Sequence, residues 1–401
     1  MDLSHSQLLT QVTDVSGAPN ITTLQLEGCI NLKVIHDSVG RLTKLLDLSL
    51  EGCTNLEVFP HGIYMTSLRS LNFNDCVSLQ HFPEILGQMD NLNRIDAERT
   101  GIKQIPHSIC YLPKLESLFL RFNDNLESIP ESINQLDALR NLNLHDCKKL
   151  QHISGFPRRL QDICVVGCIP LTSQSLNTVW SQVLQEIEFL NVSMPRTRIP
   201  NWFDYRCTSG RLSFWASRKY PKFAFAVVCG KSTNKISSEL VHIIVLIYLH
   251  GPQDFVTAHY SGGYFNNEGG TFLLELREYL TNFNHDDLNL VEIICTTSSP
   301  DYEIEECGVY MYKQDINIED IQFVCSIPNN SNMNAVMSRD AEKIEEAKHR
   351  TERAVFSDLR EFTRGCPMPL NSIMEAVMAM DDESNEDAEP GKSSNTGYVK
   401  E

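Results

Sequence analysis

Several features that would assign a chemistry to a protein are scarce or missing in this 401-residue sequence. Basic side chains are outnumbered, and the formal net charge of -18 argues against a nucleic-acid partner, because phosphate contacts need clustered Lys and Arg. The longest apolar run, near Val241 to Leu249, has the length of a strand and not of a membrane span. The N-terminus carries no basic segment followed by an apolar block, so no signal peptide is predicted. We predict neither a nucleic-acid nor a membrane partner.

Motifs for catalysis and cofactor binding are also missing. Gly230-Lys231-Ser232-Thr233 resembles the end of a phosphate-binding loop, but Phe225 occupies the position where that loop needs its first glycine. A turn at the end of a strand is therefore the favoured interpretation. No two cysteines have the two-residue spacing of a zinc site, and no His-Glu-x-x-His pattern occurs. We predict no catalytic residue, no cofactor, no metal and no enzyme activity.

One short phrase returns along the chain at an almost constant interval. It is found at Leu24–Cys29, Leu48–Cys53, Leu71–Cys76 and Leu142–Cys147, and it ends in Gly-Cys, Asp-Cys or a close variant. The last apolar residue of the phrase recurs every 23 or 24 residues, at Leu26, Leu50, Phe73, Ala97, Leu120 and Leu144. A fixed period of this length is typical of a leucine-rich repeat solenoid. We predict an α/β leucine-rich repeat solenoid over residues 1–190, closed by a capping helix within Leu171–Leu190.

Within each repeat, the alternation of leucine with polar residues predicts a short strand whose leucines point inward. Stacked strands then form a parallel sheet on the concave side. The segments that follow begin with pairs such as Phe59-Pro60 and Ile129-Pro130. Because proline has no N–H and suits the start of a helical turn, we expect irregular or 3₁₀ segments on the convex side.

The outward side chains of the concave sheet are the candidate protein-binding residues. Most of them, like Gln25 and Ser49 on the same face, could equally be solvated polar residues without a partner. The stretch Phe119–Phe122 is different, because exposed aromatic and Arg side chains are enriched in binding hot spots. Phe122 could instead turn inward into the repeat core. The full candidate set is Glu27, Glu51, Asn72, Asn74, Asp96, Glu98, Phe119, Arg121, Phe122, Asn143 and His145.

The cysteines bear on the compartment in which the protein works. There are 13, an odd number, and five occupy the same position of the repeat: Cys29, Cys53, Cys76, Cys147 and Cys168. At such a position a cysteine acts as a small buried apolar residue, not as half of a disulfide. We therefore expect a reducing intracellular compartment, the cytoplasm, with the nucleus as an alternative.

The first residues fit the second half of a repeat. Leu3 lies 23 residues before Leu26 and takes the last apolar position of its own phrase. No capping unit precedes it, although the ends of a solenoid need caps. We therefore expect the chain to be the tail of a longer protein.

A different pattern begins at Asn191, with short alternating or apolar runs separated by Gly, Pro and Asn. It predicts an all-β antiparallel sandwich or jelly roll over residues 191–325. Residues 326–401 are predicted to hold a linker, a charged helix within Ala341–Arg364 and a disordered acidic tail after Asp381. The predicted strands of the sandwich are Arg211–Trp215, Phe223–Cys229, Leu240–Leu249, Thr271–Leu276, Leu290–Cys295 and Glu306–Tyr312.

The repeat phrase resembles that of plant intracellular immune receptors. The most similar class has a Toll/interleukin-1-receptor domain, a nucleotide-binding domain and then leucine-rich repeats. Ile199-Pro200-Asn201-Trp202-Phe203, followed by Gly210 and Ser213-Phe214, resembles the opening of the C-terminal jelly-roll and Ig-like domain (C-JID) of this class. Phe223–Val228 and Glu305–Tyr310 are similar to later strands of that domain. Trp202 and Phe203 would pack as apolar anchors between the sandwich and the last repeat.

This resemblance implies recognition without signalling chemistry, because neither of the two preceding domains is in the sequence. In the family, the concave face and the post-repeat domain contact a pathogen effector, and the repeats also hold the receptor inactive. The implied function is the ligand-sensing module of a disease resistance (innate immunity) protein. Its partners would be an effector or a guarded host protein, and the nucleotide-binding domain of a full-length receptor. The alternative is a stand-alone repeat adaptor or decoy that binds host proteins.

Overall fold

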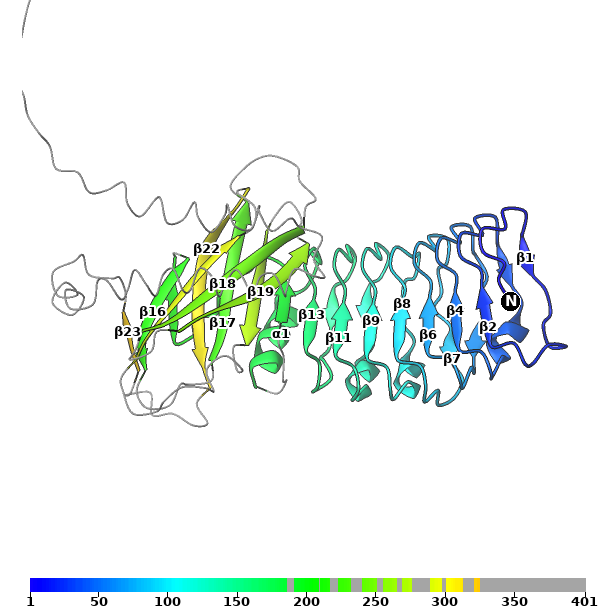
Figure 1. The fold of residues 1–401 in the computed structure, drawn as a ribbon, viewed down its shortest axis with the longest axis horizontal. Helices are drawn as coiled ribbons and strands as arrows, with labels where there is room; N and C mark the ends of the chain where they lie inside the picture. Colours follow the sequence, from blue (N-terminus) through cyan, green and yellow to red (C-terminus); the bar gives the residue numbers. More distant parts are fainter. Residues whose placement is uncertain are drawn as a thin grey trace, which may run out of the picture.

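The computed structural model describes residues 1–185, 191–208, 210–216, 223–231, 240–250, 255–264, 269–275, 289–297, 301–312 and 321–324. The first part is a stack of repeats, and the second is built from two sheets (Figure 1). The predicted charged helix and acidic tail lie outside the described residues. In the part of the chain that is described, no helix is long and apolar enough to cross a bilayer.

The repeats place their leucines in one continuous core. Leu24, Leu48 and Leu71 are buried at the centre of successive strands, and each strand pairs in parallel and in register with the next. This confirms the predicted solenoid and its concave sheet. The solenoid strands of this sheet are β2 (Thr23–Gln25), β4 (Asp47–Ser49), β6 (Ser70–Asn72), β8 (Arg94–Asp96), β9 (Ser117–Phe119), β11 (Asn141–Asn143) and β13 (Asp162–Cys164).

The convex side is made of 3₁₀ turns and short paired strands. Pro106 and Pro130 stand in extended conformation at the residue before two of the 3₁₀ helices, where a missing N–H costs no hydrogen bond. The three helices are η1 (Asp37–Arg41), η2 (His107–Tyr111) and η3 (Glu131–Gln135). The strands pair as β1 (Gln11–Val12) with β3 (Val34–Ile35), β5 (Gly62–Ile63) with β7 (Glu84–Ile85), and β10 (Ser128–Ile129) with β12 (His152–Ile153).

The first residues take the place in the stack that their spacing predicts. Asp2 forms a parallel bridge with Gln25, and the Leu3 N–H donates to the Gln25 carbonyl oxygen. Cys29 Sγ donates to the Leu3 carbonyl oxygen, as Cys53 Sγ does to that of Leu26. Leu3 is therefore the equivalent of Leu26 in the preceding repeat.

The cysteines that end the phrases form a ladder inside the solenoid. Each is buried, and its Sγ donates to a carbonyl oxygen of the preceding repeat, as from Cys76 to Leu50 and from Cys147 to Leu120. Burial raises the pKa of the Cys53 thiol to about 12. The cysteines of the described residues are all thiols, so their prediction as small buried residues is confirmed.

A helix and two antiparallel sheets follow the repeats. The predicted capping helix is α1 (Ser173–Gln185), which buries Val179, Trp180, Val183 and Leu184. The first sheet continues the concave sheet through β14 (Asn191–Met194), β20 (Gly270–Glu275), β17 (Phe223–Lys231), β22 (Tyr302–Met311) and β15 (Tyr205–Cys207). The second sheet has the order β19 (Phe255–Tyr264), β18 (Leu240–His250), β21 (Asn289–Thr297), β16 (Arg211–Ala216) and β23 (Ile321–Val324).

Strand β14 joins the solenoid to the sandwich. It pairs in parallel with β13 of the last repeat and antiparallel with β20, so one sheet runs through both parts. On β17, Ala224 and Ala226 join the solenoid core, while Phe223 and Phe225 join the core between the two sheets. A strand buried on both faces needs an almost continuous apolar run, which is what this segment has.

The six predicted sandwich strands correspond to β16, β17, β18, β20, β21 and β22. Strands β14, β15, β19 and β23 were not predicted. The short β14 and β15 have little alternation of their own and are held by pairing with β13, β20 and β22. The identification of this all-antiparallel part as a jelly-roll and Ig-like domain stays a prediction.

Candidate protein-binding surface

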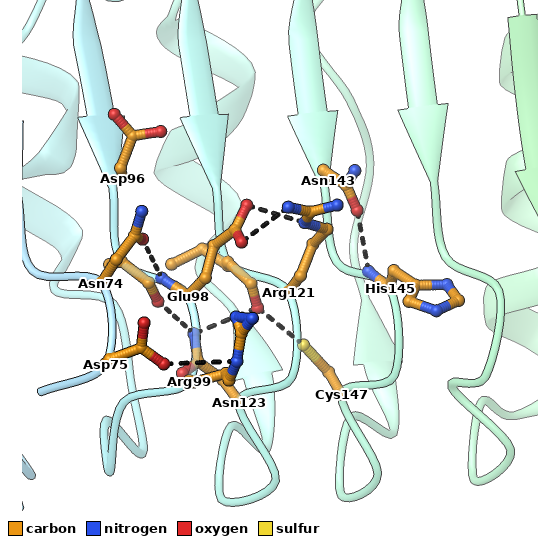
Figure 2. Close-up of polar contacts among 12 residues, drawn as sticks. Asn74, Asp75, Asp96, Glu98, Arg99, Arg121, Asn123, Asn143, His145 and Cys147 are labelled. Atoms are coloured by element: carbon orange, nitrogen blue, oxygen red, sulfur yellow. Dashed lines mark hydrogen bonds and ion pairs between the residues drawn. The ribbon is translucent and has the colours of Figure 1, made fainter. Parts of the chain in front are cut away.

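Three rows of side chains cross the concave sheet between β6 and β11, because these strands are parallel and in register. Figure 2 shows the region in which they meet. The last strand residues form the first row: Asn72, Asp96, Phe119 and Asn143. The second row lies two residues further along the chain, just after each strand: Asn74, Glu98, Arg121 and His145. The next residues form the third row: Asp75, Arg99, Phe122 and Asp146.

One residue of the first row, Asp96, forms an ion pair with an arginine of its own strand. Arg94 begins β8 and Asp96 ends it, so both point from the same face of the strand. Arg94 Nε donates to Asp96 Oδ2 at 2.7 Å, and Nη2 donates to Oδ1 at 2.8 Å. The Arg94 guanidinium also lies 4.7 Å from the centre of the Phe119 ring on β9. Phe119 is half-buried, and this contact fixes its orientation.

A second bidentate pair spans the second row (Figure 2). Arg121 Nε and Nη2 donate to Glu98 Oε1 and Oε2, both at 2.7 Å. Glu98 is only 7% exposed, and its backbone N–H donates to the Asn74 side-chain oxygen. Two parallel hydrogen bonds compensate much of the cost of burying this carboxylate and hold the guanidinium in one orientation.

The third row has a backbone conformation that favours glycine. Gly28, Gly52 and Gly167 occupy this position in other repeats, with φ between 65° and 78°. Arg99 and Phe122 occupy it with φ of 52° and 59°. A left-handed conformation at such residues costs on the order of 1 kcal/mol, and strain of this kind is concentrated at functional sites. These two large side chains are therefore presented at the rim of the concave sheet at an energetic cost.

The rim residues contact one another. The Arg99 guanidinium lies 5.3 Å from the centre of the Phe122 ring, and Arg99 Nε is 3.3 Å from Asp75 Oδ1. The Phe122 ring meets the His145 ring edge-on, with the ring centres 5.3 Å apart. Phe122 therefore does not turn into the repeat core, and this alternative is wrong.

The interacting residues of the three rows, together with Arg94, are called the concave cluster below. They are Asp75, Arg94, Asp96, Glu98, Arg99, Phe119, Arg121, Phe122, His145 and Asp146.

His145 is the most buried residue of the concave cluster, with 3% of its surface exposed. Its pKa lies below the ordinary histidine value, chiefly because burial disfavours the imidazolium. The carboxylate of Asp146, whose Oδ2 is 3.5 Å from His145 Nε2, raises this pKa, and so does the carboxylate of Glu98. The positive charge of Arg121 lowers it further. The ring is therefore neutral at pH 7 and supports the Phe122 ring from beneath the surface.

Comparison with known proteins points to one kind of relative. No family model matches the chain. The chain is 35% identical to TMV resistance protein N of Nicotiana glutinosa over 164 residues, which are 41% of this chain and 14% of that protein. It is 35% identical to disease resistance-like protein DSC1 of Arabidopsis thaliana over 195 residues, 48% of this chain and 13% of that protein.

The disease resistance protein RPP2A of Arabidopsis thaliana is 33% identical over 118 residues, 29% of this chain and 9% of that protein. This chain is a homologue of plant disease resistance proteins. The predicted kinship is confirmed, and the matches span between 9% and 14% of the length of these relatives.

Two solved leucine-rich repeat structures are similar to part of this chain. The leucine-rich repeat domain of the type III effector XopL covers 47% of this chain and 73% of that one, with a TM-score of 0.30 and 21% identity. A leucine-rich repeat protein of Leptospira interrogans covers 47% of this chain and 59% of that one, with a TM-score of 0.24 and 20% identity.

The predicted candidate residues fall into two groups. Asn72, Asn74, Asp96, Glu98, Phe119, Arg121, Phe122, Asn143 and His145 lie together on β6 to β11 and the turns that follow these strands. Glu27 and Glu51 lie on the earlier repeats, where Glu51 accepts a hydrogen bond from the Asn72 side chain. The alternative that these positions are simply solvated is wrong for Asp96, Glu98 and His145, which are 7%, 7% and 3% exposed.

Four residues of the concave cluster were not predicted: Arg94, Asp75, Arg99 and Asp146. Arg94 lies at the start of its strand, and the other three lie at the glycine position of the phrase. An alignment of the repeats against one another carries a signal for Arg99, because a large side chain stands where Gly28 and Gly52 stand. The contact of Arg94 with Phe119 joins two repeats and has no such signal.

Proposed function

We propose that this chain is the ligand-sensing module of a plant disease resistance protein and that it binds a pathogen effector protein through the concave cluster. The observation that carries the proposal is the presentation of Phe119 and Phe122 beside Arg121. The two rings are half-buried and held by Arg94, Arg99 and Arg121. Because these side chains are already ordered, binding of a partner would cost them little conformational entropy.

The charges of the concave cluster support a protein partner of mixed character. Arg94, Arg99 and Arg121 each face one carboxylate, of Asp96, Asp75 and Glu98 respectively. The cluster therefore presents aromatic edges and paired charges, and it has no strong excess of positive or negative charge. Such a surface suits the apolar centre of a protein interface surrounded by hydrogen-bonding groups.

The proposal is tested by capturing candidate effectors with the full chain and with two variants, Phe119→Ala and Phe122→Gly. The second variant installs the residue that other repeats have at this position, so the fold should be retained. If the rings are hot spots, each variant weakens binding by tenfold or more, about 1.4 kcal/mol. Arg41→Ala in η1 on the convex side is the matched control and should bind as the unchanged chain does.

Captured partners that bind both ring variants as tightly as the unchanged chain would contradict the proposed surface. Capture of host proteins alone would favour the alternative of an adaptor or decoy. A further partner, the nucleotide-binding domain of a full-length receptor, is proposed from the kinship. Competition between that domain and an effector for the chain would test it.

We also propose that the chain acts by binding and not by catalysis, inside the cell, in the cytoplasm or the nucleus. The buried thiols of the cysteine ladder support a reducing compartment, because they serve as apolar core groups and hydrogen-bond donors. A fluorescent fusion of the full chain expressed in plant cells would locate it. A secreted fusion would contradict this proposal.

A further inference from the structure

Two cysteines face each other across neighbouring strands of the first sheet. Cys207 ends β15, and Cys307 lies in β22 directly opposite it in the antiparallel pairing. Their Sγ atoms are 2.9 Å apart, although the residues are separated by 100 positions in the sequence. Both are thiols in the structure.

The backbone already has the geometry of a cross-strand disulfide. Directly opposed residues of an antiparallel pair have Cα atoms about 4.5 to 5.5 Å apart. This interval lies within the range of about 4.4 to 6.8 Å that disulfides span. A bond between these sulfur atoms therefore needs side-chain rotation and no rearrangement of β15 or β22.

The two thiols differ in access to solvent. Cys207 is half-buried, while Cys307 is buried in the core between the sheets. The pKa of Cys307 is raised: its hydrogen bond with Cys207 lowers the value, but its hydrogen bond with Cys295 and its burial outweigh that effect. Thiols of the cysteine ladder, such as Cys53 and Cys76, are fully buried. Cys207 is therefore the member of the pair that a small oxidant reaches.

We propose that Cys207 and Cys307 are an oxidation site, which a peroxide converts from a dithiol to a disulfide. The Cys207 sulfur attacks the peroxide O–O bond, giving a sulfenic acid and releasing water from hydrogen peroxide or an alcohol from an organic peroxide. The Cys307 sulfur then attacks the Cys207 sulfur, the S–O bond breaks, and the hydroxyl leaves as water with the Cys307 proton. Two electrons pass from the two thiols to the peroxide.

The bond would act on the connection between the solenoid and the sandwich. Among the described residues, strand β15 lies at the edge of its sheet and pairs only with β22. It follows directly on the segment in which Phe203 packs edge-on against Trp180 of the capping helix. A covalent link to β22 would fasten this edge strand and the segment before it. The inference does not depend on the proposed binding function.

The test treats the full chain with hydrogen peroxide and maps its disulfides by mass spectrometry. We expect a peptide pair joining Cys207 to Cys307, loss of two alkylatable thiols, and recovery of both after reduction with dithiothreitol. The oxidised chain should also melt several degrees higher than the reduced chain, because the link restrains the unfolded state. A bond from Cys307 to Cys295, or no bond while other thiols are oxidised, would overturn the proposal.

Two variants separate the steps. In Cys307→Ser, Cys207 should accumulate as a sulfenic acid that a dimedone-type probe traps, because its resolving thiol is gone. Cys110→Ser removes another half-buried thiol, on the convex side, and should leave the Cys207–Cys307 link unchanged. Absence of trapped sulfenic acid on Cys207 in the first variant would also count against the proposed sequence of events.

Discussion

At the scale of single residues, the concave cluster combines buried charge with strained backbone. Arg99 and Phe122 stand at a position that other repeats fill with glycine, and Glu98 is nearly inaccessible to water. Neither feature helps the solenoid to fold, since Gly28 and Gly52 serve the same turn without strain. The cluster is therefore better explained by what it presents than by what it stabilises.

Loss of Arg121 should expose the cost of burying the Glu98 carboxylate. Arg121→Ala removes two 2.7 Å hydrogen bonds from that carboxylate, and we expect it to lower the free energy of unfolding by about 3 kcal/mol. The double variant Arg121→Ala/Glu98→Ala should recover most of this loss, because the buried charge is gone as well. Urea denaturation of both variants measures the difference. A double variant less stable than Arg121→Ala would contradict this account.

His145 should make the stability of the chain depend on pH. Because its pKa is lowered in the folded state by burial, the unfolded chain binds the proton first as the pH falls. Stability is therefore full above about pH 6.5, the value of the free side chain, and decreases below it. Urea midpoints on either side of this pH should differ less in His145→Gln than in the unchanged chain. His61→Gln, at an exposed convex position, should keep the original dependence.

At the scale of one repeat, the turn after each strand is held by a buried donor. Cysteine supplies it in most repeats, and Asn123 supplies it after β9. The Asn123 side-chain nitrogen donates to the carbonyl oxygens of Ala97 and Leu120. Its side-chain oxygen accepts hydrogen bonds from the backbone N–H and the hydroxyl of Thr100. One amide thus serves four buried groups where a thiol serves one.

This difference predicts unequal costs for two alanine substitutions. Asn123→Ala leaves several buried polar groups without a partner and should destabilise the solenoid by about 3 kcal/mol or more. Cys76→Ala loses one hydrogen bond, from Sγ to the Leu50 carbonyl, and should cost about 1 kcal/mol. Chemical denaturation followed by circular dichroism compares the two. Equal losses would mean that the amide network contributes no more than a thiol does.

At the scale of the whole molecule, one sheet runs from the repeats into the sandwich (Figure 1). The solenoid core includes Ile199, Phe203 and Leu273, which lie after the last repeat. Strand β14 pairs with β13 on one side and β20 on the other. The two parts should therefore unfold together when this junction is intact.

Phe203 and Trp202 test this coupling, because they are adjacent and differently buried. Phe203 is 5% exposed and packs against Trp180, while Trp202 is 48% exposed. Phe203→Ala should cost about 3 kcal/mol and split the calorimetric transition into two. Trp202→Ala should have a smaller effect and keep a single transition. Both residues were expected to anchor the sandwich on the last repeat: Phe203 packs against Trp180 of the capping helix, whereas the half-exposed Trp202 packs against Phe203 and Tyr310.

Much of the fold was predictable because it depends on local period. A repeat of 23 or 24 residues sets the register of the concave strands, and alternation of apolar residues marks the longer strands such as β17 and β18. The candidate surface was predictable in part for the same reason. Phe119 and Arg121 alternate with the buried Leu118 and Leu120, so their face is set by the strand.

What the sequence determined by itself is therefore the stack of repeats, the face on which each concave side chain lies, and the kinship with plant disease resistance proteins. The tertiary structure decided which of those side chains meet. Arg121 reaches Glu98 over 23 positions of sequence, and Cys207 reaches Cys307 over 100. The repeat period places Glu98 and Arg121 in neighbouring repeats, but no local pattern sets which side chains pair, because these contacts form when whole repeats and whole strands are packed side by side.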